Sequence, residues 1–550
     1  MSALLIVGID GLPPALAAAL IAEGRTPALA ALAQRGSLGV LTSTPNYQSA
    51  SAWTSLVTGV NPGKHGILHF TNPVRGTYGL AQIDARARRA PSLWRLLSER
   101  GLRVVALNFP VSYPAEPVTG VMISGWLCPS PHAPGFTYPP DLAAQIAARW
   151  GDYPIHADVR RHVARGDFEA AARAAERGIT AKGEVATWLL EREAPDAAGV
   201  VFTELDSLQH WCWHILDERH PEHDPALAAR WRERLLAVYE RMDEQVGALV
   251  EAVGSDADVL VVSDHGQAPN SGAQVLLRPW LVAAGYLMPR RRPLLRRAAD
   301  RLSALGFEAL KGRAPARLKA ALRARLPGLQ GRAQAGMRGI AADWARTRAW
   351  TETGHIFVNQ RGRWPQGIVE PGPATEALLA ELAKGLAELR DADTGEPLVA
   401  GTERGATQFH GPHVDLMPDL LVHWRHDLHT TVARWRGQEI APARPPTLPP
   451  GAHHPDGTLV ACGPSFAALV DAPAMSICDV APTAMHLLGQ AVPDSMDGRV
   501  MTELLTATAA QEVRIEAVNH EAQGSPGEQV HEVDGVVMQR LRSLGYIDQE

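Results

Sequence analysis

Residues 4–10 read LLIVGID, a short apolar run that ends on an acid and is followed by Gly11. Similar runs recur along the chain, apolar almost throughout and rich in β-branched residues: RVVALNF (103–109), GVVFTELD (199–206), DVLVVSDHG (258–266), PDLLVHW (418–424) and TLVACG (458–463). Continuous apolarity, in place of strict alternation, indicates strands with both faces covered. The runs therefore predict a mainly parallel sheet that is buried between layers of helices.

Helical patterns separate these runs, which is typical of an α/β/α sandwich. They cover residues 16–34, 93–101, 141–149, 165–194, 225–253 and 375–390. Two regions interrupt the alternation. Residues 126–198 carry few strand signals after a Pro- and Gly-rich entry, and residues 286–345 are Arg-rich with Leu at helical spacings. We expect a single catalytic domain over residues 1–550, with these two regions as helical insertions that cap the sheet.

The composition is that of an ordinary globular protein. The chain has 550 residues, of which 46% are hydrophobic and 20% charged, and this excludes wholesale disorder. Its four cysteines are scattered and form no CxxC pair, which excludes a disulfide framework and favours a reducing compartment. The longest apolar runs fall far short of the roughly 20 residues that span a membrane, and the N-terminus lacks the basic region of a signal peptide. We therefore expect a cytoplasmic protein without a transmembrane segment.

The charge of the chain is unevenly distributed. The net charge is -6, yet residues 290–348 carry sixteen Lys or Arg residues against three acids. One interpretation is a solvated helix face. The other is a patch that steers polyanionic substrates or binds anionic lipid headgroups, giving weak association with anionic membranes. No recognised nucleic-acid-binding module accompanies the charge.

Acids and histidines stand where several of the apolar runs end. Asp10 closes the first run, Asp206 closes another with His210 four residues on, and Asp264 and His265 close a third. Because the carboxyl ends of parallel strands share one edge of a sheet, we expect these side chains to converge. Carboxylates gathered there would repel one another, and divalent cations relieve that repulsion. The mixed set suits Zn²⁺, with Mn²⁺ as an alternative, although any single acid could instead be a helix cap.

Ser49 is the candidate nucleophile. It begins a predicted helix that runs to Thr58 and is ended by Gly59. The free N–H groups at a helix N-terminus favour an anion beside them. The chain has no G-x-S-x-G nucleophile elbow, so activation would come from a metal bound to the hydroxyl. The alternative is simple N-capping by Ser49 or Ser51.

Five stretches of the chain together resemble the alkaline phosphatase superfamily, and specifically its type I phosphodiesterase / nucleotide pyrophosphatase family in the bacterial group of predicted phosphohydrolases. They are MSALLIVGIDG (1–11), SASAWTSLVTGVNPGKHGI (49–67), FTELDSLQHWCWH (202–214), VVSDHG (261–266) and GAHHPDG (451–457). They occur in the order of that family. The resemblance implies an alkaline-phosphatase-like fold with two bound divalent metal ions.

The resemblance also implies that two sets of side chains hold these ions. The first set has three members: Asp206, His210 and His453. In the second set the last member is also the nucleophile: Asp10, Asp264, His265 and Ser49. Of the paired histidines, His453 occupies the position of the family ligand and His454 falls outside the pattern.

The implied activity is that of a two-metal phosphohydrolase, most closely a phosphodiesterase or nucleotide pyrophosphatase, acting through a phosphoseryl intermediate on Ser49. A phosphomonoesterase and a phospho-group mutase or transferase are alternatives, and so is a non-catalytic binding module on the same fold. The substrate would be a phosphate-ester small molecule, a nucleotide or a lipid headgroup. The family places a phosphoryl-binding Asn five residues after the His of its H-G-I motif, where this chain has Phe70. Asn72 and Asn108 are the candidates to replace it, and each could instead be a turn residue.

Overall fold

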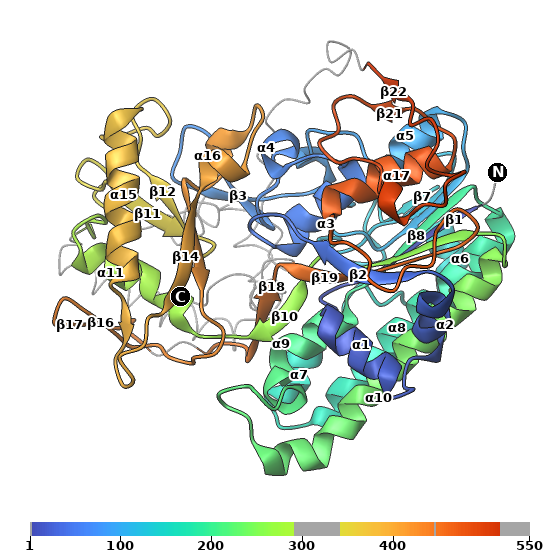
Figure 1. Ribbon diagram of the computed structural model, residues 1–550, viewed down its shortest axis with the longest axis horizontal. Coiled ribbons are helices and arrows are strands. Elements are labelled where there is room, and N and C mark those ends of the chain that lie inside the picture. Colours follow the sequence, from blue (N-terminus) through green and yellow to red (C-terminus); the bar gives the residue numbers. More distant parts are fainter. Residues whose placement is uncertain (1–2, 291–341, 445–446, 518–550) are drawn as a thin grey trace, which may run out of the picture.

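A nine-stranded sheet forms the centre of the main part of the protein in this computed structural model (Figure 1). The structure describes residues 3–290, 342–444 and 447–517. Five neighbouring strands, β9-β1-β8-β5-β6, run parallel, and antiparallel strands flank them on each side. In sheet order the strands are β20 (Met475–Ser476), β2 (Ser37–Thr42), β19 (Asp456–Cys462), β9 (Asp258–Val262), β1 (Leu4–Ile9), β8 (Ala197–Phe202), β5 (Val104–Leu107), β6 (Gly120–Ile123) and β7 (Thr137–Tyr138).

Helices cover both faces of this sheet, which confirms the predicted α/β/α sandwich (Figure 1). One face carries α1 (Pro14–Ala22), α2 (Pro27–Arg35), α6 (Leu142–Trp150), α7 (Val159–Val163), α8 (Phe168–Glu193), α9 (Glu204–Leu216) and α10 (Pro225–Val253). The other carries α3 (Ser49–Thr58), α5 (Leu93–Glu99) and α17 (Val480–Leu487). Along β1, Leu5 and Val7 enter the first core while Leu4 and Ile6 enter the second. Both faces of the strand are therefore buried, and this explains its unbroken apolarity.

Each of the six apolar runs contains a strand, but two of these strands differ from the predicted parallel arrangement. β19 runs antiparallel to both of its neighbours, β9 and β2. β15 (Leu420–Trp424) belongs to a separate sheet. Continuous apolarity reports only that both faces of a strand are covered, which holds for both strands, and it carries no information on strand direction.

The predicted helices form as well, with one break. The pattern over residues 16–34 is divided into α1 and α2, because Gly24 adopts a φ of 72° and Thr26 precedes Pro27 and so avoids the helical region. Within the described ranges, no single helix is long and apolar enough to cross a membrane. Among the described helices, only α1 and α2 taken together, with a bend of 102° between them, pass that test by length and composition.

A second region with its own core lies beside the main sheet (Figure 1). Its elements are a four-stranded antiparallel sheet of β11 (Ala349–Glu352), β12 (His355–Val358), β15 and β14 (Val399–Arg404), a three-stranded sheet of β13 (Arg390–Asp391), β16 (Ala433–Trp435) and β17 (Gln438–Ile440), and the helices α11 (Leu277–Ala283), α15 (Pro373–Ala387) and α16 (Gly405–Gln408). Trp280, Trp350 and Phe357 are fully buried at its centre. Two short strands, β10 (Gly266–Pro269) and β18 (Gly451–His454), pair between the two regions.

The two predicted insertions differ in how much of them the structure describes. Residues 126–198 contain the expected helices α6 and α8 and the short α7 between them, and α8 packs along α10 against the main sheet. Their status as an insertion stays a prediction. Most of the Arg-rich segment 286–345, namely residues 291–341, lies outside the described residues.

Candidate active site

Three of the predicted site residues follow directly on the central strands. β1 ends at Ile9 and is followed by Asp10, and β9 ends at Val262, shortly before Asp264 and His265. β1 and β9 are adjacent and parallel, so these side chains leave the sheet at the same edge. This is the placement that the sequence predicted.

Asp206 and His210 reach this edge from a helix, and not from a strand end as predicted. β8 ends at Phe202 and α9 begins at Glu204, so Asp206 lies in the first turn of the helix. The helix dipole favours a carboxylate there. His210 follows one turn later on the same face, with its Nε2 3.3 Å from Asp206 Oδ1. The apolar run overestimated the strand because the first turn of α9 is as buried as β8.

A two-stranded ribbon brings His453 to the same place. β10 starts directly after His265 and pairs antiparallel with β18. The register sets His453 opposite Gln267, and the rings of His453 and His265 stack with their centroids 3.6 Å apart. The ribbon therefore joins a residue from far along the chain to those at the strand edge.

Asp206, His210 and His453 form what we call the first ligand group. One potential ligand atom of each residue lies within 4.8 Å of the others. The Nε2 atoms of the two histidines are 2.9 Å apart, and Asp206 Oδ1 lies 3.6 Å from His453 Nε2. All three side chains are buried. The sequence assigned the same three residues to one metal.

Backbone carbonyl groups fix the orientation of both imidazoles in this group. His210 Nδ1 donates to Gly451 O at 3.0 Å, and His453 Nδ1 donates to Tyr47 O at 3.0 Å. A carbonyl oxygen only accepts hydrogen bonds, so each Nδ1 carries a proton, and a neutral ring then presents a lone pair on Nε2. When both rings are neutral, the two lone pairs face each other at 2.9 Å and repel. Burial lowers the pKa of His210, but Asp206 outweighs this and raises it, so without a cation a proton on His210 Nε2 relieves the repulsion. A cation bound by both nitrogen atoms removes that repulsion, and the tethered Nδ1–H is typical of metal-binding histidines.

Asp10, Asp206 and His265 form the second ligand group, again with potential ligand atoms within 4.8 Å of one another. Asp264 adjoins it, because His265 Nε2 lies 3.4 Å from Asp10 Oδ1 and also 3.4 Å from Asp264 Oδ2. His265 Nδ1 donates to Gly266 O at 2.9 Å, which directs Nε2 toward the carboxylates. Asp206 thus belongs to both groups, whereas the sequence assigned it to the first alone.

Two carboxylate oxygens beside His265 indicate that a cation fits the second ligand group. Asp10 Oδ1 and Asp264 Oδ2 are buried and have no hydrogen-bond partner among the residues that the structure describes. The second oxygen of each accepts a hydrogen bond, from Trp53 Nε1 at 3.0 Å and from Gly11 N at 3.3 Å respectively. Buried carboxylate oxygens without donors are costly unless they bind a cation. Carboxylate and imidazole donors together fit a divalent metal ion such as Zn²⁺ or Mn²⁺.

Ser49 begins α3, as predicted, and lies against the second ligand group. Its Oγ is 3.0 Å from His265 Nε2, and its side chain is fully buried. Ser51 has other partners, since its Oγ donates to Asn46 Oδ1 and to Gln48 O at 3.0 Å each. Of the two serines, Ser49 therefore reaches the ligand residues and Ser51 holds the loop before the helix.

The pKa values of the acids and of His453 indicate that the two ligand groups carry more negative charge than the neighbouring side chains neutralise. Burial, followed by the charges of Asp264 and Asp206, raises the pKa of Asp10 well above its usual value. Burial also raises the pKa of Asp264 to about 6. For Asp206, burial raises the pKa, but the interactions with His210 and His453 outweigh it and the pKa falls. Burial, together with repulsion from neighbouring histidines, lowers the pKa of His453 well below its usual value. Added cations would allow Asp10 and Asp264 to ionise beside the carboxylate of Asp206.

The two asparagines considered as phosphoryl-oxygen donors have different surroundings. Asn72 holds its own loop, because its Oδ1 accepts from Leu68 N at 3.0 Å and its Nδ2 donates to Gly66 O at 2.6 Å. Asn108 follows β5 with a φ of 64°, and its Oδ1 accepts from the Tyr153 hydroxyl at 2.7 Å. Asn108 Nδ2 is buried without a hydrogen-bond partner among the described residues, so it has a donor to offer.

The sequence analysis missed a buried ion pair that supports the site. Lys182 Nζ lies 2.7 Å from Glu204 Oε1, and both side chains are only 1% exposed. Glu204 is the first residue of α9, so the pair anchors the helix that presents Asp206 and His210. A Lys on the apolar stripe of residues 165–194 was the signal that could have revealed it.

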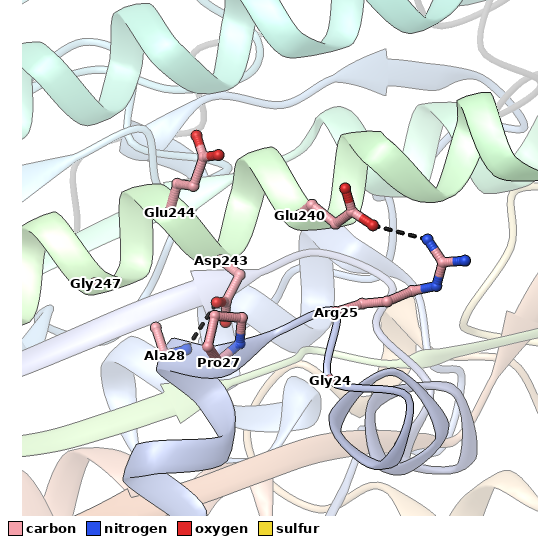
Figure 2. A pocket seen from close by; sticks show the side chains of 8 residues that line it. All are labelled: Gly24, Arg25, Pro27, Ala28, Glu240, Asp243, Glu244 and Gly247. Carbon is pink, nitrogen blue, oxygen red and sulfur yellow. Dashed lines mark hydrogen bonds and ion pairs between the residues drawn. The ribbon is translucent and has the colours of Figure 1, made fainter.

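A pocket of about 430 Å³ lies elsewhere in the fold, between α2 and α10 (Figure 2). Its polar side chains already have partners within the protein. Asp243 accepts hydrogen bonds from the backbone N–H groups of Ala28 and Leu29 at 2.7 and 2.8 Å, and Arg25 Nη1 lies 2.7 Å from Glu240 Oε1. Asp243 in this pocket thus caps the start of α2, and none of the candidate metal ligands lines the pocket.

Comparison with known proteins identifies the family and the fold. The profile of the type I phosphodiesterase / nucleotide pyrophosphatase family matches residues 4–330. The chain is similar in structure to phosphonoacetate hydrolase from Sinorhizobium meliloti 1021 in complex with phosphonoformate, with 15% sequence identity, a TM-score of 0.51 and coverage of 88% of this chain and 96% of that chain. It is also similar to murine ectonucleotide pyrophosphatase / phosphodiesterase 5, with 12% identity, a TM-score of 0.47 and coverage of 92% and 100%. A search of curated protein sequences finds no match. The first structural similarity bears out the predicted fold.

Proposed function

The chain belongs to the type I phosphodiesterase / nucleotide pyrophosphatase family and is a metal-dependent phosphoester hydrolase, and we propose that it uses two divalent cations and a phosphoseryl intermediate on Ser49. The first ligand group would hold one cation. The other would be held by the remaining acids and histidine together with the nucleophile: Asp10, Asp264, His265 and Ser49. We propose Zn²⁺ as the metal, with Mn²⁺ as the alternative.

The opposed histidines of the first ligand group carry this proposal. His210 Nε2 and His453 Nε2 face each other at 2.9 Å while each Nδ1 is committed to a carbonyl oxygen. Two neutral rings in this arrangement repel each other unless a proton or a metal cation lies between them, and the same geometry suits two nitrogen ligands of one cation. Asp206 Oδ1 completes a set of three protein ligands, and such sets leave a position for substrate or water.

The chain's own residues would then divide the reaction into two steps. Ser49 Oγ loses its proton and attacks phosphorus, the P–O bond to the leaving alcohol breaks, the alcohol departs with a proton, and the phosphoryl group is esterified to Ser49. Water next hydrolyses the phosphoserine, which restores the Ser49 hydroxyl and releases the phosphate product. When bound, divalent cations lower the pKa of hydroxyl and water groups and neutralise charge on phosphoryl oxygens. The backbone N–H groups at the N-terminus of α3 would also stabilise the negative charge on the phosphoryl oxygens.

We assign the missing phosphoryl-oxygen donor to Asn108. The hydroxyl of Tyr153 donates to Asn108 Oδ1, which leaves Nδ2 as the unused donor. A buried donor without an acceptor is costly, and a phosphoryl oxygen would satisfy it. The contacts of Asn72 with its own loop make it the weaker candidate.

Metal analysis followed by hydrolysis of a panel of esters tests the proposal. We expect about two bound cations per chain, and hydrolysis of bis(4-nitrophenyl) phosphate faster than of 4-nitrophenyl phosphate or 4-nitrophenyl sulfate. Chelation should abolish the activity, and Zn²⁺ or Mn²⁺ should restore it. A faster monoester reaction would favour the phosphomonoesterase alternative. Full activity in thoroughly chelated protein would refute the role of the metals.

Two further expectations remain proposals. No disulfide bond links the cysteines among the described residues, in keeping with a reducing compartment, and we retain the cytoplasm as the proposed location. The charge of the Arg-rich segment would steer anionic substrates, and we expect hydrolysis of an anionic ester to slow as the salt concentration rises. A rate that does not depend on ionic strength would remove this role.

A further inference from the structure

The carboxamide of Gln267 has no function in the machinery described so far, and its surroundings are unusual. The residue is 5% exposed, and neither Nε2 nor Oε1 has a hydrogen-bond partner in the part of the chain that the structure covers. Gln274, seven residues later, is satisfied in the ordinary way, because its Nε2 donates to Asn270 Oδ1 at 2.9 Å. A buried carboxamide that leaves both polar atoms unpaired destabilises the fold unless a ligand pairs with them.

The backbone places this carboxamide beside the first ligand group. Gln267 and His453 are directly opposed in the β10–β18 ribbon, so their side chains share one face of it. A Cβ atom at Gly451 would lie 2.4 Å from Gln267 Nε2 and 3.1 Å from His210 Cα. Glycine at position 451 therefore leaves the space in which the carboxamide lies, between the ribbon and α9.

A second carboxamide on α9 has the same property. Gln209 is fully buried, and its Nε2 and Oε1 also have no hydrogen-bond partner within the described ranges. Its main-chain oxygen lies 2.7 Å from the position that a Gly451 Cβ would take, so both glutamines adjoin the same place.

The chemistry of a carboxamide indicates which chemical group of a substrate it would bind. It offers donors on nitrogen and an acceptor on oxygen, and it carries no charge. A hydroxyl group can donate to Oε1 and accept from Nε2, so it satisfies both atoms. A phosphate oxygen can only accept, and an ammonium group can only donate, so each would leave one atom of Gln267 unpaired.

We propose that Gln267 is a substrate-binding residue that recognises a hydroxyl group on the leaving alcohol of the phosphate ester. This inference rests on the proposed function: Ser49 Oγ lies against the second ligand group, so an in-line attack directs the leaving alcohol to the opposite side of the phosphorus, where we place the first ligand group. Its consequence is a substrate class: phosphate esters of an alcohol that bears at least one further hydroxyl group.

A matched pair of esters tests this preference. Two methyl phosphodiesters, one of propan-1-ol and one of propane-1,3-diol, differ in a single hydroxyl group. We expect the metal-loaded enzyme to favour the diol ester in kcat/KM by about ten-fold, the ratio that one net hydrogen bond supplies. Calorimetry on metal-loaded Ser49→Ala, which would bind without turnover, should show the same preference in Kd.

Two variants separate substrate binding from a structural role. Gln267→Met keeps the length of the side chain and removes both polar atoms, so we expect the preference to fall to about one through loss on the diol ester alone, with Tm unchanged or higher. Gln274→Met is the matched control and should keep the preference. Equal loss on both esters in Gln267→Met, or a wild-type enzyme that hydrolyses both esters equally, would overturn the inference while leaving the proposed function intact. Failure to bind or hydrolyse either ester would count against the proposed function itself.

Discussion

Replacement of Ser49 by alanine separates the proposed nucleophile from its structural surroundings. Within the described ranges, Ser49 Oγ has one hydrogen-bond partner, His265 Nε2 at 3.0 Å. Its removal should cost about 0.5–1.5 kcal/mol of unfolding free energy, the value of one net hydrogen bond. Loss of a covalent nucleophile, in contrast, typically lowers kcat by about 10⁴-fold or more. We therefore expect Ser49→Ala to be folded, nearly as stable as the wild type, and inactive toward phosphate esters.

Ser51 provides the matched control on the same helix. Both serines are fully buried, but Ser51 Oγ contacts three groups: Asn46 Oδ1 and Gln48 O at 3.0 Å each, and Thr44 Oγ1 at 3.2 Å. Ser51→Ala leaves these groups short of a partner, so we expect a larger stability loss of about 1–3 kcal/mol. In the described part of the chain, Ser51 contacts neither ligand group, so we expect the kcat of Ser51→Ala to fall by less than about ten-fold. A ten-fold change corresponds to about 1.4 kcal/mol in the activation free energy.

The two variants should therefore rank in opposite orders by activity and by stability. Initial rates with bis(4-nitrophenyl) phosphate give the first order, and urea unfolding followed by fluorescence gives the second. Mass spectrometry of acid-quenched turnover mixtures should detect a phosphorylated peptide that contains residue 49 in the wild type. Substantial turnover by Ser49→Ala, or a phosphopeptide that lacks residue 49, would refute the assignment.

Three further predictions concern the charges of the site. Asp206→Asn should weaken binding of both cations, because Asp206 is a proposed ligand of one and its charge also lies within 4.8 Å of the Asp10 and His265 atoms that would hold the other. His453→Ala should weaken binding of one cation. Elemental analysis after dialysis should give fewer cations in the Asp206 variant, and equal metal content would contradict this. In metal-free protein, Tm should fall as the pH rises from about 4 to about 6. Burial raises the pKa of Asp264 to about 6 from its usual 3.8, so the stability present below pH 3.8 is lost as the carboxyl ionises. Scanning fluorimetry should show this fall in Tm, bound Zn²⁺ should remove it, and a rising Tm would contradict the prediction. Lys182→Met should cost about 3–5 kcal/mol because it leaves Glu204 buried and unpaired, and the double variant with Glu204→Gln should recover part of that loss in urea unfolding.

Much of the fold could be predicted because burial leaves a direct trace in the sequence. Leu4, Leu5, Ile6 and Val7 alternate between two cores, and only apolar residues satisfy both, so the central strands could be recognised from composition alone. The edge position of Asp10, Asp264 and His265 followed from the rule for parallel strands. The sequence analysis named every member of both ligand groups in the described structure, although their role as ligands stays a proposal.

Other features left no such trace. Strand direction depends on connections and not on burial, so the antiparallel course of β19 was not apparent. The end of β8 was misjudged, because Leu205 is as buried in α9 as Val201 is in the strand. The carbonyl groups that orient the histidines, such as Tyr47 O, carry no side-chain signature at all. The space for Gln267 depends on the absence of a Cβ at Gly451, which becomes visible only once α9 and the ribbon are packed together.

The most direct test of the account is a crystal structure of the Zn²⁺-loaded protein with anomalous data collected at the zinc edge. The account predicts two anomalous peaks about 4 Å apart. One should be bound by Asp206, His210 and His453, and the other should lie between Asp10, Asp264 and His265 within bonding distance of Ser49 Oγ. A single peak, or peaks bound by other residues, would contradict it.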